Sequence, residues 1–584
     1  MNFIDISDLN ISTTLDVLRR DTQRNSLFLY QHKGDFFANA NRIGNVDQNI
    51  AQTKFLKFLK KAQQDNIGLV LSPEYSCPKS VVDYIIDNEN MQPALNKVWV
   101  LGGESINKEE IAQLLSVNKD SVFIHCEDVI SNTDKSYSDP LYYIFKGVHT
   151  GIPKLIILIQ FKTRHMGGLW GGGNVEADNL IEGNDIYIIK NSNSSTRLVS
   201  FICSEAMNVR QELTQDVKDN ILDWNDKPYL ILNPQINPNP SHIEFVRFRD
   251  FIFESDKKEI ISLNWGKETF LNNRPWYPKD INTPRSGVFF KTSDVELDYS
   301  SNKITNNHKK GFYFLHIIRN RFVYFLNGTI ELIKIVNKPV DITEGVAQQR
   351  RREGPEAIIV YAFVTVNCNF NELQSIDDQH IDFFNQMGVT NNFLLNAVNS
   401  IVDKERLINI STGKVIGKLE NKWCDVIYLN SFNLKEADEC NCRMTYVEDT
   451  YASSETIRTL NCTNLIELDQ VILPDKSQYP ESIKDLTHHN IILSYSQDAP
   501  TYKYKYNLTN DNGEVKRATI CYLGNVSANQ VKITYDELQK LFDEGSEGKR
   551  RIVVFYKKGT DLYSKYDESA GSITNPSNDN SSIL

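Results

Sequence analysis

The chain has 584 residues, of which 40% are apolar and 24% charged, a balance typical of globular proteins in water. One hydrophobic core rarely serves a chain of this length, so we expect two or more domains. The formal net charge of −11 argues against a dedicated nucleic-acid-binding protein, because such proteins need an excess of Lys and Arg to neutralise phosphates.

The beginning of the chain does not have the pattern of a secretory signal. Its first ten residues include Asp5 and Asp8 and lack a basic start followed by an apolar run. The longest apolar stretch, residues 155–161, is interrupted by Gln160 and is too short to span a bilayer. The nine cysteines are odd in number and scattered, which is not the pattern of a disulfide framework. We therefore expect a cytoplasmic protein without a membrane anchor.

The first half of the chain alternates strand-like and helix-like stretches. Residues 55–64 have the apolar spacing of a helix, whereas short apolar runs before and after them are typical of buried strands. The expected strands cover residues 26–31, 67–74, 98–104, 155–160, 198–203, 229–232 and 259–263. Strands that alternate with helices predict an α/β fold.

A break is expected at residues 348–355, where a charged run with Gly354 and Pro355 suits a linker. Beyond it we predict a strand at 357–366, a mainly helical stretch at 383–406 and a hairpin at 502–522. The last residues are rich in Ser and Asn, as disordered segments are. The pattern predicts a catalytic domain at 1–340, a separate mixed α/β domain at 356–566 and a disordered tail at 567–584.

Three polar residues stand at the ends of expected strands: Glu74, Lys162 and Cys203. In α/β sheets, side chains beyond the carboxyl ends of strands meet in a common crevice. A thiol is a weak nucleophile until it loses its proton, so it needs a base or a neighbouring cation. We expect Glu74 to take that proton, and Lys162 to stabilise first the thiolate and then the oxyanion of a tetrahedral intermediate. The backbone N–H of Ser204 is the expected second oxyanion donor.

These segments resemble the nitrilase (carbon–nitrogen hydrolase) superfamily. The segment Leu-Ser-Pro-Glu-Tyr around Glu74 resembles the Phe-Pro-Glu segment of nitrilases and amidases. Lys162 resembles their lysine, and Ile-Cys-Ser-Glu around Cys203 resembles their nucleophile turn. The family also places a second glutamate between Lys and Cys, a position that Glu176 matches, with Glu182 as a nearby competitor.

Further segments agree with the family in order along the chain. They are Gln31, the Gly-Gly-Glu of residues 102–104, the Arg-Phe-Arg-Asp of 247–250, the Asn-Trp-Gly of 264–266 and the Ser-Gly of 286–287. The resemblance covers about 310 residues, from about residue 20 to 335, which is slightly more than half of the chain. Two departures stand out: Ser204 replaces the usual aromatic residue, and a glycine-rich insert at residues 165–174 lengthens the loop after the lysine.

The resemblance implies a four-layer α-β-β-α sandwich that assembles as a homodimer or a higher homo-oligomer. The implied reaction is attack of Cys203 on an amide or nitrile carbon, giving a thioester that water hydrolyses. Glu74 is the implied base and Lys162 the oxyanion donor, while Glu176 orients Lys162 or the leaving group. Ser204 and Glu205 are expected at the oxyanion and substrate pocket. Neither a metal nor an organic cofactor is required.

Other interpretations remain open. Cys203 taken alone reads as an ordinary buried cysteine. Cys440 and Cys442, with Cys424 and Cys462, suggest zinc only weakly, because a single-residue spacer is atypical of structural zinc sites. An alternative function is a nitrilase-like scaffold or small-molecule sensor in a bacterial antiviral defence system, signalling to a separate protein partner through the C-terminal half.

Overall fold

The computed structural model describes residues 1–19, 25–128, 134–166, 174–192, 196–240, 242–254, 258–277, 285–291, 312–316, 321–340, 351–374, 407, 410–413, 452–494 and 506–569. The chain divides into two compact units. The first unit comprises Met1–Asp298, Asn306–Ile376 and Asn433–Ala437, and the second comprises Tyr299–Thr305, Asp377–Phe432 and Asp438–Leu584. The described elements of the first unit form a mixed α/β fold.

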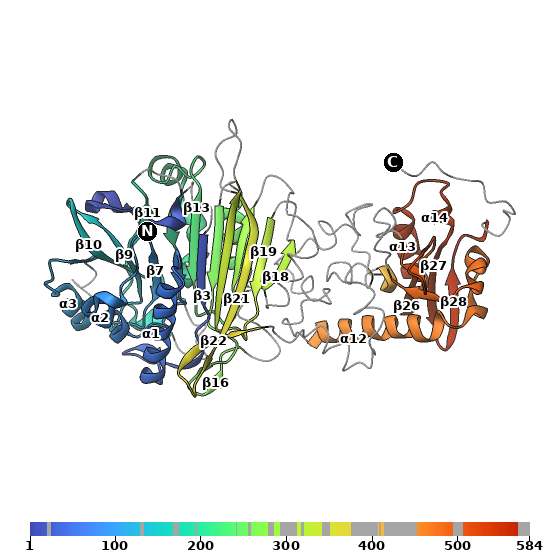
Figure 1. Ribbon diagram of the computed structural model, residues 1–584, viewed down its shortest axis with the longest axis horizontal. Helices are drawn as coiled ribbons and strands as arrows, with labels where there is room; N and C mark the ends of the chain where they lie inside the picture. Colours follow the sequence, from blue (N-terminus) through green and yellow to red (C-terminus); the bar gives the residue numbers. More distant parts are fainter. Residues whose placement is uncertain are drawn as a thin grey trace. The chain divides into compact units, whose positions relative to one another are not determined.

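A ten-stranded sheet forms one part of the first unit (Figure 1). In spatial order its strands are β22 (Asn369–Leu373), β21 (Arg351–Val364), β20 (Leu332–Val340), β3 (Asn25–Tyr30), β6 (Leu69–Leu71), β7 (Val98–Gly102), β9 (Pro140–His149), β10 (Ile152–Phe161) and β8 (Val122–Cys126), and β2 (Ile11–Ser12) pairs with β9. Strands β6 and β7 are parallel, and β9 is antiparallel to both β7 and β10. Strands β6, β7 and β10 therefore run in the same direction and end at the same edge.

Three helices cover one face of this sheet (Figure 1): α1 (Gln48–Gln64), α2 (Lys79–Asp87) and α3 (Lys108–Leu115). Their apolar side chains share one core with the sheet, as Phe58 of α1 does with Phe28 of β3. The N-terminus of α1 is capped by Asp47, whose carboxylate accepts the backbone N–H of Ile50. The expected helix at 55–64 is confirmed, and the cap shows why it begins earlier.

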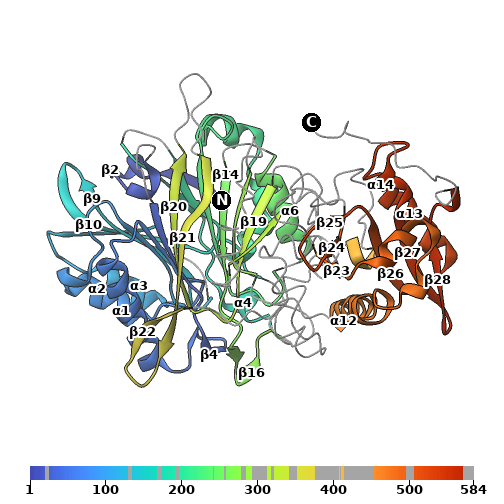
Figure 2. The same cartoon turned by 45° about the vertical axis from the view of Figure 1, so that its right-hand side comes forward.

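An eight-stranded sheet forms the other part of the first unit. Its strands are, in order, β1 (Asn2–Asp5), β11 (Asp185–Lys190), β12 (Arg197–Ser200), β13 (Tyr229–Pro234), β14 (Lys258–Leu263), β17 (Gly287–Lys291), β19 (Arg321–Leu326) and β18 (Phe312–His316). Gln160 of β10 joins the two sheets: its amide donates to the carbonyl of Ser200, 3.1 Å away. Helix α6 (Ile243–Ile252) is labelled in Figure 2, and its Phe248 packs edge-on against Phe201, which follows β12.

Shorter elements complete the described part of the first unit. A four-stranded sheet has the order β16 (Arg274–Pro275), β15 (Thr269–Leu271), β4 (Gly34–Ala38) and β5 (Ile43–Asn45). The remaining helical turns are η1 (Ile6–Leu9), η2 (Asp16–Leu18), η3 (Glu89–Met91), α4 (Val175–Asn179), η4 (Cys203–Met207), α5 (Val209–Glu212) and η5 (Val217–Ile221). Of these, α4 and η4 carry residues of the candidate site.

The first unit continues beyond the boundary expected near residue 340. Strand β21 begins at Arg351, inside the stretch expected to be a linker, and pairs antiparallel with β20. Tyr361 of β21 and Phe370 of β22 are buried in the core shared with α1. The hairpin of β21 and β22 thus extends the sheet and buries aromatic side chains. In the sequence, the charged run at residues 348–355 obscured this extension.

The described part of the second unit has its own apolar core. Strand β26 (Thr519–Asn525) is parallel to β27 (Ile552–Lys558), which pairs antiparallel with β28 (Asp561–Lys565). The other elements are α12 (Ala452–Glu467), η6 (Leu468–Ile472), η7 (Lys476–Gln478), η8 (Glu481–His488), β23 (Ile491–Leu493), β24 (Leu508–Asn510), β25 (Val515–Lys516), α13 (Ala528–Gln539) and α14 (Glu547–Arg550). Strands β24 and β25 form the expected hairpin around the turn at Gly513.

Some expectations concern residues outside the described part of the chain. These are the helical stretch at 383–406, the cysteines at 424, 440 and 442, and all of the tail after residue 569. Among the described residues, no helix combines the length and the apolar character needed to cross a membrane.

Candidate active site

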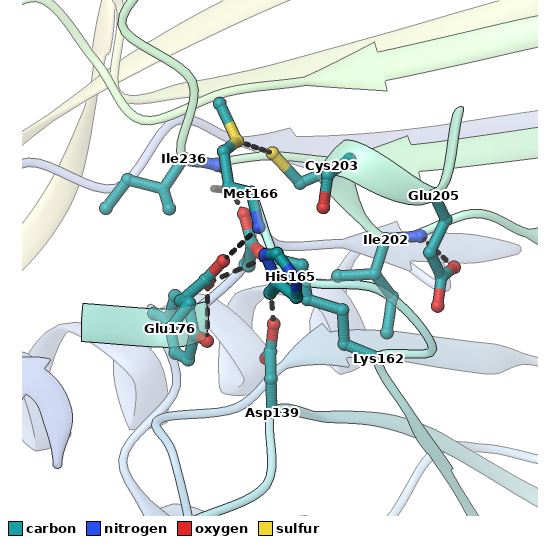
Figure 3. A network of polar contacts seen from close by, with 12 residues as sticks. Asp139, Lys162, His165, Met166, Glu176, Ile202, Cys203, Glu205 and Ile236 are labelled. Atoms are coloured by element: carbon teal, nitrogen blue, oxygen red, sulfur yellow. Dashed lines mark hydrogen bonds and ion pairs between the residues drawn. The ribbon is translucent and has the colours of Figure 1, made fainter. Parts of the chain in front are cut away.

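The four expected catalytic residues lie together at one edge of the two sheets. Glu74 follows β6, Lys162 follows β10, Cys203 follows β12 at the start of η4, and Glu176 belongs to α4. Each side chain is at most 1% exposed. Figure 3 shows the side chains of Lys162, Glu176 and Cys203 converging on one small region. Elements distant in sequence thus deliver a thiol, an ammonium and two carboxyl groups to one place.

Lys162 is the centre of the charge network. Its Nζ donates to Oε1 of Glu74 at 2.6 Å and to Oε1 of Glu176 at 2.8 Å. The second oxygen of each carboxylate accepts a backbone N–H, from Ile236 at 2.8 Å for Glu74 and from Met166 at 2.7 Å for Glu176. Both carboxylates are therefore held from two sides, which fixes the position of the ammonium between them.

The two carboxylates also decide the charge of the lysine. Burial by itself lowers the pKa of Lys162, but the nearby Glu176 and Glu74 carboxylates outweigh it and raise that pKa well above its ordinary value. Lys162 consequently remains an ammonium ion at any physiological pH. A fixed positive charge in a site without solvent is suited to stabilising an oxyanion.

Glu176, and not its competitor Glu182, contacts Lys162. Glu182 is 37% exposed at its side chain and accepts the backbone N–H of His165 at 3.0 Å. Glu176 is fully buried and also accepts the hydroxyl of Tyr75 at 2.8 Å. Glu176 is buried because it lies on the short helix α4, whereas Glu182 lies beyond the end of this helix.

Asp139 belongs to the same network, although it was not expected from the sequence. It immediately precedes β9, is 1% exposed, and its Oδ2 lies 4.0 Å from Nζ of Lys162. The backbone N–H of Lys162 donates to the carbonyl of Asp139, which ties the two segments together. Burial and the Glu74 carboxylate raise the pKa of Asp139 well above its ordinary value. The only sequence signal was an acid placed just before an apolar strand.

Cys203 has the backbone of a strained nucleophile turn. Its φ angle is +39°, in the left-handed region that residues with a side chain rarely adopt. Burial and the Glu74 carboxylate raise the pKa of the Cys203 thiol well above its ordinary value, although Lys162 acts in the opposite direction. A thiol in these surroundings keeps its proton until a base removes it.

Met166 covers the thiol. Its Sδ lies 3.3 Å from Sγ of Cys203, and only 8% of the residue is exposed. Figure 3 shows the methionine side chain reaching the sulfur of Cys203 from the segment that follows Lys162. A molecule that approaches Cys203 from this side must displace the Met166 side chain.

Ser204 and Glu205 have different surroundings from one another. The hydroxyl of Ser204 donates to the carbonyl of Arg164 at 2.7 Å, whereas its backbone N–H makes no hydrogen bond within the described part of the chain. Glu205 accepts the backbone N–H of Ile202 and that of Thr163, both at 2.6 Å. Its carboxylate thus joins the nucleophile turn to the lysine segment. Backbone N–H groups thus contact both oxygens of Glu205, and its place in a substrate pocket stays a prediction.

An apolar cluster packs beside the charged network. It contains Tyr75, Tyr137, Trp265 and Tyr277, all buried. The indole N–H of Trp265 donates to the carbonyl of Glu74 at 2.7 Å, and the Tyr277 hydroxyl donates to the carbonyl of Trp265 at 2.9 Å. Burial raises the pKa of Tyr277, with a contribution from the nearby Cys203 sulfur. Aromatic side chains thus keep the acid–base groups away from water.

The three carboxyl groups around Lys162 also have the composition of a metal site. One oxygen from each of Glu74, Asp139 and Glu176 lies within 4.8 Å of the others. Two of these oxygens already accept hydrogen bonds from the Lys162 ammonium, which provides the positive charge locally. A divalent cation would compete with Lys162 for the same oxygens, so the geometry favours a catalytic lysine site.

Comparison with known structures finds likenesses that cover less than half of the chain. An amidase from Nesterenkonia sp. is 10% identical over 43% of this chain and 80% of its own, with a TM-score of 0.26. A CN-hydrolase superfamily protein from Xanthomonas campestris is 9% identical over 42% of this chain and 77% of its own, with a TM-score of 0.24. The first half of the chain is similar in structure to nitrilase-superfamily amidases.

Two further comparisons complete this finding. A variant of the amidase from Nesterenkonia sp. AN1, in which acrylamide has added to the active-site cysteine, is 9% identical over 49% of this chain and 99% of its own, with a TM-score of 0.25. No protein-family model and no curated protein matches the chain.

Proposed function

We propose that the protein is a hydrolase that cleaves a non-peptide carbon–nitrogen bond, in an amide or a nitrile, through a thioester on Cys203. One observation carries the proposal: a permanently charged, buried lysine is held between two carboxylates, and one of these also neighbours a thiol on a strained turn. A base, a nucleophile and an oxyanion donor in one site without solvent are the requirements of cysteine-dependent acyl transfer.

In the proposed reaction with an amide, Glu74 accepts the thiol proton as Sγ of Cys203 attacks the carbonyl carbon. The Lys162 ammonium and the free backbone N–H of Ser204 stabilise the oxyanion of the tetrahedral intermediate. When this intermediate collapses, the carbon–nitrogen bond breaks and protonated Glu74 gives its proton to the leaving nitrogen. The acyl group remains on Cys203 as a thioester.

The second half of the reaction uses the same groups. Glu74 accepts a proton from water, which attacks the thioester and releases the acid, and the proton returns to the sulfur of Cys203. Glu176 holds Lys162 in position throughout, through the 2.8 Å hydrogen bond between them. The residues of the chain supply every proton transfer in this scheme, without a cofactor.

We extend the proposal to the architecture and assembly. The helices α1–α3 on one sheet, the contact from Gln160 to the second sheet and the packing of α6 on the far side support a four-layer α-β-β-α arrangement. Homo-oligomerisation and a separate protein partner for the second unit are further parts of this proposal, as are a cytoplasmic location and a role of the second unit in substrate access.

The test is ammonia release from a panel of small amides and nitriles, combined with mass spectrometry of acid-quenched protein. We expect an acyl adduct on Cys203 and ammonia release that depends on Glu74. Binding of a panel compound with neither ammonia nor adduct would instead support the small-molecule sensor, including its use in an antiviral system.

A further inference from the structure

The charges around Lys162 do not balance. Three carboxyl groups, from Glu74, Asp139 and Glu176, surround a single ammonium in a region at most 1% exposed. Leaving two net negative charges unpaired in such a region costs several kcal/mol per ion, even after relaxation. The least costly arrangement keeps a proton on one of the three carboxyl groups.

The partners of the three groups show where this proton resides. Glu74 and Glu176 each bond directly to Nζ of Lys162 and each accept a backbone N–H. Asp139 accepts no hydrogen bond from any donor among the described residues, and its nearer oxygen is 4.0 Å from the ammonium. A carboxylate without donors is poorly stabilised, whereas a carboxylic acid in the same place can itself donate. Among the charged neighbours of Asp139, Glu74 acts on it most strongly, ahead of Glu176.

We propose that Asp139 is a protonated acid at neutral pH that donates a hydrogen bond to Glu74, and that this bond positions Glu74 as the base of the site. Asp139 is a positioning residue here, since it acts on the reaction only through Glu74. Its protonation is independent of the proposed function, whereas its effect on turnover rests on that function.

The titratable groups that face Asp139 come from every element packed around it. They are Glu74 after β6, Tyr75 beside it, Tyr137 before β9, Lys162 after β10 and Glu176 on α4. Burial raises the pKa of both tyrosines above their ordinary range, so they stay neutral. Around neutral pH, Asp139 therefore faces two carboxylates and one ammonium, which is the balance that favours its acid form.

The decisive experiment is infrared spectroscopy of the full chain in D2O at pH 7, for the wild type and Asp139→Asn. A buried carboxylic acid has a carbonyl band above that of carboxylates, and we expect the wild type to lose one such band on substitution. Asp178→Asn is the matched control, since Asp178 is exposed on α4 and should not change this band. An unchanged band in Asp139→Asn overturns the proposed protonation.

Turnover tests the positioning role. An asparagine amide can still donate to Glu74, so Asp139→Asn should keep kcat within about threefold of the wild type, whereas Asp139→Ala should lose about tenfold or more. Asp139→Asn should also remove any fall in kcat that the wild type shows as Asp139 ionises at alkaline pH. Equal losses in the two variants, with thermal melts showing both folded, would mean that a carboxylate is needed and would overturn the proposal. If no amide is turned over, the infrared result still decides the protonation.

Discussion

Two buried cysteines, one in each unit, differ in the backbone and the charged groups around their thiols. Cys203 and Cys521 are both 0% exposed, and burial raises the pKa of both thiols. Cys521 lies within strand β26, in an apolar core and without a charged neighbour that affects it. Cys203 lies just after a strand, has a φ angle of +39°, and is influenced by Glu74 and Lys162.

Burial alone raises the pKa of a thiol and keeps it in its unreactive, protonated form. What distinguishes Cys203 is a base within reach, a fixed cation and a turn that presents the sulfur beyond the strand end. Its raised pKa is compatible with catalysis if the proton moves to Glu74 during attack. Each of the following experiments removes one feature that separates the two cysteines.

The largest effect is expected from replacing the nucleophile itself. Cys203→Ala should lower turnover on the order of 10⁴-fold, because the covalent path disappears, while the fold is retained. Cys521→Ala should leave turnover unchanged and lower the unfolding free energy by about 1 kcal/mol, as loss of a small buried side chain does. The measurements are ammonia release and chemical denaturation. Wild-type turnover in Cys203→Ala would refute the cysteine mechanism.

Removal of the cation should have the next largest effect. Lys162→Met should reduce kcat on the order of a hundredfold and change KM little, because an oxyanion donor acts mainly in the transition state. Lys146→Met, on strand β9 away from the site, is the control and should match the wild type. A change confined to KM would show that Lys162 only positions the substrate.

Removal of the Met166 side chain, which covers the Cys203 thiol, should alter access to Cys203 and not to Cys521. Met166→Ala should speed alkylation of Cys203 by iodoacetamide on the order of tenfold, because Sδ no longer lies against Sγ, whereas Cys521 should react as slowly as before. Met91→Ala, at another buried methionine of the first unit, serves as the control. Peptide mapping in which both cysteines accelerate equally would indicate general loosening of the fold.

The last prediction concerns stability instead of turnover, and it involves the Glu205 carboxylate, which joins the turn at Cys203 to the segment after Lys162. Burial raises the pKa of Glu205 to about 7, although the N–H groups of Thr163 and Ile202 act against this rise. The folded protein therefore holds a proton that the unfolded chain releases near its ordinary pKa. Hence the contribution of Glu205 to the unfolding free energy is fully present below that ordinary pKa and falls by about 3 kcal/mol as the pH rises through 7.

Glu205→Gln tests the direction of this change in unfolding free energy with pH. The difference in unfolding free energy between the wild type and the variant should decrease as the pH rises from 5 to 8, measured by denaturant titration at each pH. A constant difference for Glu205→Gln would show that this carboxyl group has an ordinary pKa.

The sequence by itself determined the strands that carry the site and the order of their reactive residues. Short apolar runs that end in Glu74, Lys162 and Cys203 are local patterns, and a strand end fixes where the next side chain lies. Residues 55–64 of helix α1 were likewise predicted from their apolar spacing, whereas its first turns were not. These features depend on residues close together in the chain.

Only the tertiary structure decided what surrounds those residues. Asp139 joins Lys162 because β9 and β10 pair, Glu205 turns to backbone donors of two segments, and Met166 covers Cys203 after the chain folds back. The pairing of β21 with β20 likewise moved the end of the first unit beyond residue 340. Contacts between distant segments, and the pKa values that burial imposes on them, have no local pattern, because they arise only when the sheets pack and water leaves.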